Sequence, residues 1–174
     1  MSQELEIERT YLAKDLPVGL EKCACREIID LYLPRKAVHA KLRVRKSGDS
    51  YAITKKTPVS EASASIQTEE TIKITPEEFK ALLKADVRKI EKRRYLYPVG
   101  KLTAEIDVFG GKLKGLVLVD FEFNSASEAQ NFVMPDFCLA DVTEEDYIAG
   151  GVLSKYSYRQ LKQFLKGYEY KRIS

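Results

Sequence analysis

The chain has little histidine and little cysteine, which limits the chemistry it can carry. His39 is the single histidine among 174 residues, so histidine-based metal sites and Ser–His or Cys–His catalysis are not expected. Cys23, Cys25 and Cys138 are the three cysteines, and they do not show the paired spacing of a zinc site. We expect free thiols in a reducing compartment. Any catalysis would therefore depend on carboxylates, lysines and arginines.

Long apolar runs and a strong net charge are also missing. No run reaches the roughly eighteen apolar residues of a membrane span, and the N-terminal segment is acidic rather than basic and apolar. We therefore predict neither a membrane helix nor a secretory signal, and expect a cytoplasmic protein. The net charge of +3 does not by itself indicate a nucleic-acid partner. The length and the hydrophobic fraction of 44% fit one globular domain over residues 1–174.

Most of the chain alternates apolar and polar residues with a period of two, which predicts strands. Helical signals are fewer. Thr75 is placed as an N-cap with Pro76 next and Glu78 completing a capping box. A second helix is capped by Ser125 or Ser127. These patterns predict an α+β protein dominated by antiparallel sheet. The strands are expected at residues 4–12, 27–33, 39–46, 50–56, 68–74, 88–97, 102–109 and 115–124, the loop at 57–67, and the helices at 75–86, 125–132 and 154–167.

On strand after strand, the face opposite the apolar one carries charges of a single local sign. A plain solvated face explains any one strand well, because antiparallel sheets commonly expose one side to water. It explains the set less well, since such faces mix signs and like charges directly opposite each other are destabilising. The acidic faces are Glu4/Glu6/Glu8, Glu105/Asp107 and Asp120/Glu122, and the basic ones are Lys41/Arg43/Arg45 and Lys92/Arg94, with Lys56 nearby.

A barrel with these faces turned inward would give the segregation a function. Carboxylate oxygens suit divalent cations such as Mg²⁺ and Mn²⁺. Arginine and lysine suit phosphate oxygens. The residues alone thus indicate a metal-dependent binder or hydrolase of a polyanionic phosphate.

The same residues resemble the CYTH family, also called triphosphate tunnel metalloenzymes. The stretch "EIERTYL" is similar to the family's Glu-x-Glu-x-Lys signature at Glu6 and Glu8, and "DVTEEDY" (141–147) to its later "EVTxD" segment. Further matches are Arg43 and Arg45 in an Arg-x-Arg hairpin, Lys56 and Glu69 on the next strands, Lys92 and Arg94 in "EKRRYLY", and Glu105, Asp107, Asp120 and Glu122 in "AEIDVFGGKLKGLVLVDFEF".

The resemblance implies an eight-stranded antiparallel barrel around a tunnel, with helices packed outside. It implies a small-molecule triphosphate substrate, either inorganic tripolyphosphate or a nucleoside or organic triphosphate. It also implies a Mg²⁺ or Mn²⁺ cofactor and often a homodimer, with no nucleic acid or membrane as partner. Glu6 and Glu8 are the candidate catalytic residues. The candidate phosphate-binding residues are Lys41, Arg43, Arg45, Lys56, Lys92 and Arg94, and the candidate metal-binding residues are Glu6, Glu8, Glu69, Glu105, Asp107, Asp120 and Glu122.

Three positions depart from the family pattern. Thr10 stands where the signature has lysine, Thr71 where several hydrolases have glutamate, and "YIAGG" (147–151) where basic residues often follow. Each change removes a charge that could orient substrate or tune a metal-bound water. Two alternatives to a metal-dependent triphosphatase therefore stay open: a non-catalytic binder of polyphosphate or nucleotides, and a class IV-type adenylyl cyclase.

Overall fold

The computed structural model describes residues 6–37, 40, 42–58 and 66–173, and for Glu6, residues 56–58 and residues 66–69 it describes the backbone alone. Glu4, Lys41 and residues 59–65 of the predicted loop therefore lie outside the description. The strands are β1 (Glu6–Ala13), β2 (Ala24–Leu33), β3 (Leu42–Ser47), β4 (Ser50–Pro58), β5 (Ile66–Lys73), β6 (Arg88–Val99), β7 (Leu102–Phe109), β8 (Val117–Phe123) and β9 (Cys138–Asp141). The helices are α1 (Pro76–Leu83), α2 (Ala126–Asn131), α3 (Gly150–Leu153) and α4 (Tyr158–Leu165), with 3-10 turns η1 (Leu20–Lys22), η2 (Gly111–Leu113), η3 (Asp146–Ile148) and η4 (Lys166–Tyr168).

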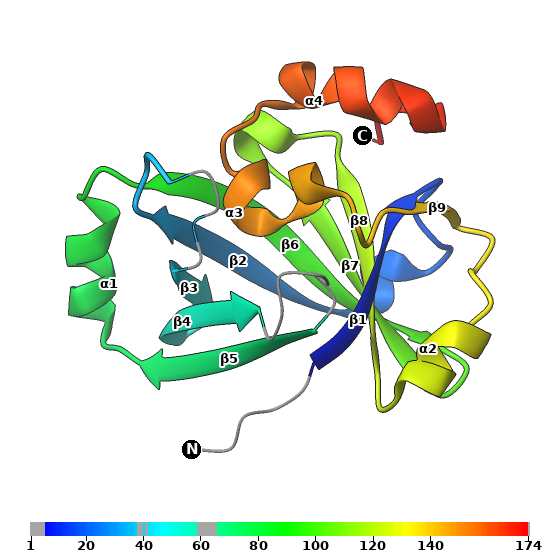
Figure 1. Ribbon diagram of the computed structural model, residues 1–174, viewed down its shortest axis with the longest axis horizontal. Coiled ribbons are helices and arrows are strands. Elements are labelled where there is room, and N and C mark those ends of the chain that lie inside the picture. Colours follow the sequence, from blue (N-terminus) through cyan, green and yellow to red (C-terminus); the bar gives the residue numbers. More distant parts are fainter. Residues whose placement is uncertain (1–5, 38–39, 41, 59–65, 174) are drawn as a thin grey trace.

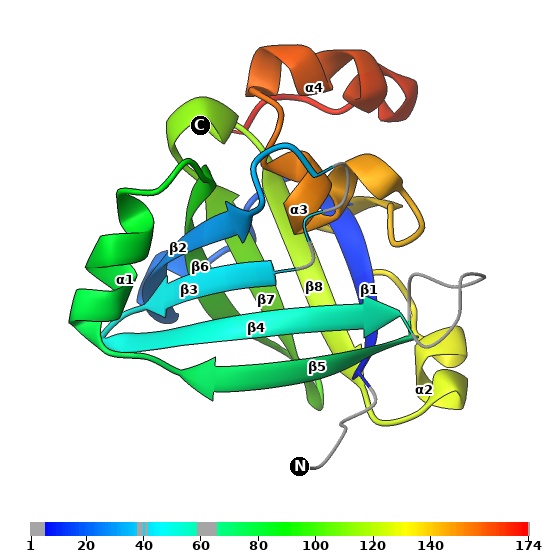
Figure 2. The ribbon, with the colours of Figure 1, turned by 60° about the vertical axis from the view of Figure 1, so that its left-hand side comes forward.

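The nine strands form one antiparallel sheet in the order β5-β4-β3-β2-β6-β7-β8-β1-β9. The sheet curls until β1 meets β5, where Glu6 pairs with Gln67 and Ile7 with Ile66. Because this seam spans only two positions, the sheet is barrel-like rather than closed along its length. Figure 2 shows β3, β4 and β5 on the near side and β6, β7 and β8 behind them, with helices outside. The predicted antiparallel barrel with external helices is confirmed.

Strand β9 is an addition to the predicted eight. It pairs with β1 beyond the β5 seam, at Tyr11, Leu12 and Ala13, and the register shifts between Leu12 and Ala13. Its four residues, "CLAD", are too short to show an alternating pattern. The sequence therefore gave no strand signal here.

The helix caps follow the predicted chemistry. Thr75 and Glu78 form the expected capping box of α1, and of the two candidate caps for α2 the Ser125 side chain makes the contact, accepting from the Glu128 amide. The predicted helix at 154–167 is wrong in extent. A second capping box, between Ser157 and Gln160, starts α4 at Tyr158, and the chain before it forms the short α3. None of the described helices is long and apolar enough to cross a membrane.

Apolar side chains pack on both sides of the strands. On the outer face of β1 and β8, Tyr11, Phe121 and Phe123 pack around Phe132, the residue that follows α2. Full burial of side chains of this size stabilises a fold by about 1.5 to 3 kcal/mol each. Farther around the curved sheet, on the same outer face, Phe79 of α1 packs against β2 and β3.

A further apolar cluster occupies one end of the barrel. It joins strand residues Leu12, Ile90, Phe109 and Leu118 to residues of η3, α3 and α4. Figure 1 shows α3 and α4 together at this end, above the strands. The C-terminal segment therefore closes the barrel at one end with apolar packing. The members contributed by that segment include Ile148, Leu153, Leu161 and Leu165.

Candidate functional site: a charged inner face

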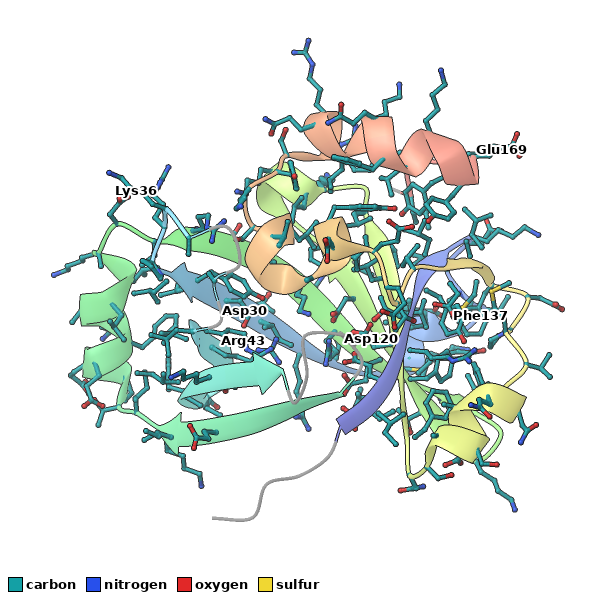
Figure 3. The ribbon with its side chains drawn as sticks, in the orientation of Figure 1. Asp30, Lys36, Arg43, Asp120, Phe137 and Glu169 are labelled. Atoms are coloured by element: carbon teal, nitrogen blue, oxygen red, sulfur yellow. The ribbon has the colours of Figure 1, made fainter. Side chains whose placement is uncertain are left out.

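The strand register places the predicted charged residues on one face of the sheet. Residues that pair across antiparallel strands point to the same side. The pairs are Glu8–Glu122, Thr10–Asp120, Glu105–Asp120, Arg94–Asp107 and Asp30–Arg45. We call this side the inner face. Figure 3 shows Asp30, Arg43 and Asp120 within the barrel, whereas Lys36, Phe137 and Glu169 lie at its periphery.

Arg94 on β6 lies at the centre of the inner face. Its Nε and Nη2 donate to Oδ1 and Oδ2 of Asp107, both at 2.7 Å, in a bidentate pair. Nη2 also donates to Oδ2 of Asp120 at 3.1 Å, and Nη1 to Glu105. Burial alone would lower the pKa of Arg94, but the hydrogen bonds and charges of these carboxylates raise it. The guanidinium of Arg94 therefore contacts carboxylates of both β7 and β8.

Lys92 precedes Arg94 by two residues on β6, so it lies on the same face and also contacts Asp107. Its ammonium donates to Oδ2 of Asp107, and the two side chains are 9% and 2% exposed. Burial lowers the pKa of Lys92, and the nearby positive charge of Arg94 adds to this. Burial would raise the pKa of Asp107, but Lys92 and Arg94 outweigh it and hold the value below the ordinary one. Asp107 is thus an ionised, buried counter-charge for two cations.

Asp30 on β2 is the buried counter-charge of Arg45 on β3. Arg45 donates from Nε and Nη2 to the two Asp30 oxygens at 2.7 and 2.8 Å. Asp30 is 1% exposed, and the contact with Arg45 lowers its pKa although burial acts the other way. The sequence analysis did not select Asp30. Its signal was a carboxylate inside the apolar run "IIDLYL" (28–33), two residues from Ile28 and two from Tyr32.

Thr10 places a neutral donor where the family signature has lysine. Its hydroxyl donates to Oδ1 of Asp120 at 2.8 Å. Burial and the charge of Asp107 raise the pKa of Asp120, while Arg94, Lys92 and the Thr10 hydroxyl oppose this rise. Arg9 points to the other side of the strand and lies 3.6 Å from Asp141, so it does not replace the missing lysine.

The other predicted site residues are placed less completely. Glu8 and Glu122 pair across β1 and β8, and Arg43 shares its strand parity with Arg45. Thr71 shares a hydrogen bond of 3.0 Å with Thr54. Lys41 and the side chains of Glu6, Lys56 and Glu69 lie outside the description, although the backbones of Lys56 and Glu69 are paired.

The carboxylates of the inner face suit a hard divalent cation. Among the described side chains, no group of three or more His, Cys, Asp or Glu residues is arranged to hold a metal ion. The donor chemistry nevertheless fits, because Glu8 faces Glu122 and Glu105 faces Asp120 across neighbouring strand pairs. Arg94 offsets the repulsion between Glu105 and Asp120. Oxygen ligands are the ones that Mg²⁺ and Mn²⁺ prefer.

The fold and its inner face define a class of protein: a barrel-like tunnel in which partly buried arginine and lysine side chains face carboxylates of neighbouring strands. The chain belongs to the CYTH domain family, whose model matches residues 4–132. The matched part contains β1 to β8, α1 and α2. It ends before β9, α3 and α4, so the C-terminal segment lies beyond it.

Individual relatives agree with this assignment. An inorganic triphosphatase of Nitrosomonas europaea is 38% identical over 144 residues, which cover 80% of this chain and 90% of the relative. A crystal structure of an inorganic triphosphatase is 29% identical, with a TM-score of 0.66 over 88% of this chain and 97% of that chain. A candidate adenylate cyclase of Bacillus halodurans shares the fold at 13% identity, with a TM-score of 0.57 over 100% of this chain and 95% of that one.

Proposed function

We propose that this protein hydrolyses a triphosphate on the inner face of the barrel, with inorganic tripolyphosphate as the first substrate to test. One observation carries the proposal: the partly buried Arg94, Lys92 and Arg45 share a single face with the carboxylates of β1, β7 and β8. Such a face can bind the phosphate oxygens and a divalent cation together. The inorganic triphosphatase of Nitrosomonas europaea supports the choice of substrate.

The cations of the inner face would bind and neutralise the triphosphate. We assign this role to Arg43, Arg45, Lys92 and Arg94, together with Lys41 and Lys56. Charge builds on the leaving diphosphate during phosphoryl transfer, and fixed cations that face it lower the barrier. Asp107 and Asp30 would act as positioning residues, because each binds its arginine through both carboxylate oxygens. For Asp107 we propose this role, and the metal contact that the sequence pattern predicts for it stays a prediction.

The carboxylates nearest β1 would hold Mg²⁺ or Mn²⁺. We assign Glu8, Glu122, Asp120 and Glu105 to this role, with Glu6 and Glu69 completing the set. When bound, such an ion polarises the phosphoryl group and lowers the pKa of water, which supplies a nucleophile at neutral pH. Thr10 holds one oxygen of Asp120, and Arg94 holds the other. These two contacts fix the orientation of that carboxylate.

Phosphate release from tripolyphosphate, ATP and thiamine triphosphate, each with Mg²⁺ or Mn²⁺, tests the proposal. Glu8→Gln should abolish the metal-dependent release, while Glu144→Gln, at an exposed position beyond β9, should leave it unchanged. Survival of activity in Glu8→Gln would refute the assignment of the metal site. Formation of cyclic AMP and diphosphate from ATP would identify a cyclase instead.

A non-catalytic binder is the second candidate, and Thr10 is the observation that favours it. A hydroxyl fills the place of a lysine beside Asp120, so one positive charge is missing from the inner face. Tight binding of tripolyphosphate without turnover, measured by calorimetry with either metal, would support this candidate over the hydrolase.

A further inference from the structure

Two adjoining cavities lie outside the barrel, where the C-terminal segment packs on it. The first, of about 310 Å³, lies between the start of β6 and η2. The second, of about 610 Å³, lies between η2, α4 and the residues that follow η4. Gly111 and Lys112 line both cavities, so the two are neighbours. We call them together the basic groove. Figure 1 shows α4 above the strands, and residues 170–172, which follow η4, line the second cavity together with the first residues of α4.

The second cavity is lined by cations without counter-charges. None of the described residues that line it is acidic. Four of its six cations come from the chain beyond the part that matches the family model. The cationic residues are Lys112, Lys114, Arg159, Lys162, Lys171 and Arg172.

The first cavity holds a buried guanidinium with unused donors. Arg88 is 6% exposed, and its Nη2 donates to the carbonyl of Ala37 at 3.0 Å. Its Nε and Nη1 have no hydrogen-bond partner among the described residues. Buried donors on a charged group are costly when they stay unpaired. The Nε and Nη1 hydrogens point from different edges of the guanidinium plane, so each can donate to a separate phosphate oxygen rather than to an oxygen pair in one fork.

The cations around Arg88 divide into neutralised and unneutralised ones. Arg35 lies 3.2 Å from Asp86, and Lys89 lies 2.7 Å from Glu91. Lys112 instead donates to the backbone carbonyl of Ser154, which carries no net charge. Burial and the positive charge of Arg35 lower the pKa of both Arg88 and Lys112. Arg88 and Lys112 thus each donate to a backbone carbonyl and not to a carboxylate.

The aromatic side chains of the groove are already engaged. The guanidinium of Arg172 lies over the ring of Tyr158, 5.3 Å from its centre. The hydroxyl of Tyr170 accepts from the amide of Val117 and donates to the carbonyl of Gly115. Single-stranded nucleic acids are bound through free aromatic faces on which bases stack, so this surface favours a ligand without bases.

The apolar residues that line the groove, Val87, Ile90 and Leu113, are buried or half-buried, unlike those of a membrane-binding surface. The exposed large hydrophobic side chains described, such as Leu83 and Met134, do not line either cavity. Interfacial helices need such residues to enter the lipid. Charge without bases or lipid-seeking groups matches a chain made of phosphate alone.

We propose that the basic groove is a second anion-binding site, outside the barrel, for a chain of inorganic polyphosphate. Arg88 and Lys112 bind one end of the bound stretch, and the cations of α4 and the C-terminal residues bind its continuation. The proposal does not rest on catalysis in the barrel.

Binding of fluorescently labelled medium-chain polyphosphate, followed by anisotropy in EDTA over a range of salt concentrations, tests the groove. The double variant Arg159→Gln/Lys162→Gln should bind at least about tenfold more weakly, and its salt slope should fall by about two, since two phosphate contacts are lost. Its kcat/KM for tripolyphosphate should not change. The matched control Lys80→Gln/Lys84→Gln removes two exposed charges near α1, away from the groove, and should bind like the wild type.

Equal affinity in the groove variant and the wild type would overturn the proposal, because it would place all polyphosphate in the barrel. Equal losses in both double variants would also overturn it, since they would show a nonspecific charge effect. Tighter binding of single-stranded DNA or of phosphatidylserine vesicles at the same salt would assign the groove to another partner.

Arg88→Met separates binding from a structural role. The substitution removes the unpaired donors, so the melting temperature should stay the same or rise while polyphosphate affinity falls. A lower melting temperature with unchanged affinity would show that Arg88 serves the fold alone.

Discussion

Replacing Asp107 with asparagine tests whether the inner face is held together by its buried charges. The substitution keeps the side-chain volume and removes the negative charge from a residue that is 1% exposed. It leaves Lys92 and Arg94 without their shared partner. Removing one partner of a buried ion pair typically costs about 3 to 5 kcal/mol. For a domain of this size that corresponds to a fall in melting temperature of about 6 to 20 °C.

The measurement is thermal unfolding without metal at neutral pH, with Asp136→Asn as the matched control at an exposed position. The sign of the shift is decisive. If Asp107 mainly held a metal ion, its removal would relieve repulsion among the carboxylates and raise the melting temperature of the metal-free protein. A rise, or a fall of less than about 2 °C, would refute the account of Asp107 as a counter-charge.

The other predictions concern neighbouring positions. Asp120→Asn should raise the melting temperature at neutral pH and not at acid pH. The pKa of Asp120 is raised in the folded protein, so the ionised carboxylate opposes folding. This cost disappears as the pH falls through the folded pKa. The pKa of Asp30 is lowered in the folded protein, so its ionised form stabilises the fold and Asp30→Asn should destabilise the protein at neutral pH. The loss of stability should become smaller as the pH falls through the folded pKa, and a constant loss would contradict this. Gly150→Ala should lower the melting temperature by several degrees, because a Cβ there would overlap the Tyr32 hydroxyl; an unchanged value would show that Tyr32 moves freely.

The architecture could be predicted from the sequence because it follows from local signals. Period-two alternation marks a strand wherever one side packs and the other carries charge, and the Thr75–Glu78 box marks a helix start without any tertiary contact. The extent of the last helix could not be predicted as easily. Its amphipathic pattern runs through Ser154, but Ser157 satisfies the first free amides of α4 and so sets where that helix begins.

The inner face could be predicted as a set, but its pairings could not. Which carboxylate meets which cation depends on the register between β6, β7 and β8, and no local signal sets that register. Asp30 was missed for a related reason. In sequence it is one polar residue in an apolar strand, and only the β2–β3 register shows that it lies opposite Arg45. Arg88 gave no signal either, because its unused donors are visible only once its neighbours are in place.

The apolar packing at one end of the barrel limits how a ligand can reach the inner face. Lys92 marks the border, with Asp107 on its charged side and the Phe109 ring 5.6 Å from its ammonium on the apolar side. Beyond Phe109, the interior is filled by the side chains of the C-terminal segment. This packing blocks passage through that end of the barrel. A phosphate chain bound on the inner face would therefore direct one of its ends, rather than its middle, toward the apolar cluster.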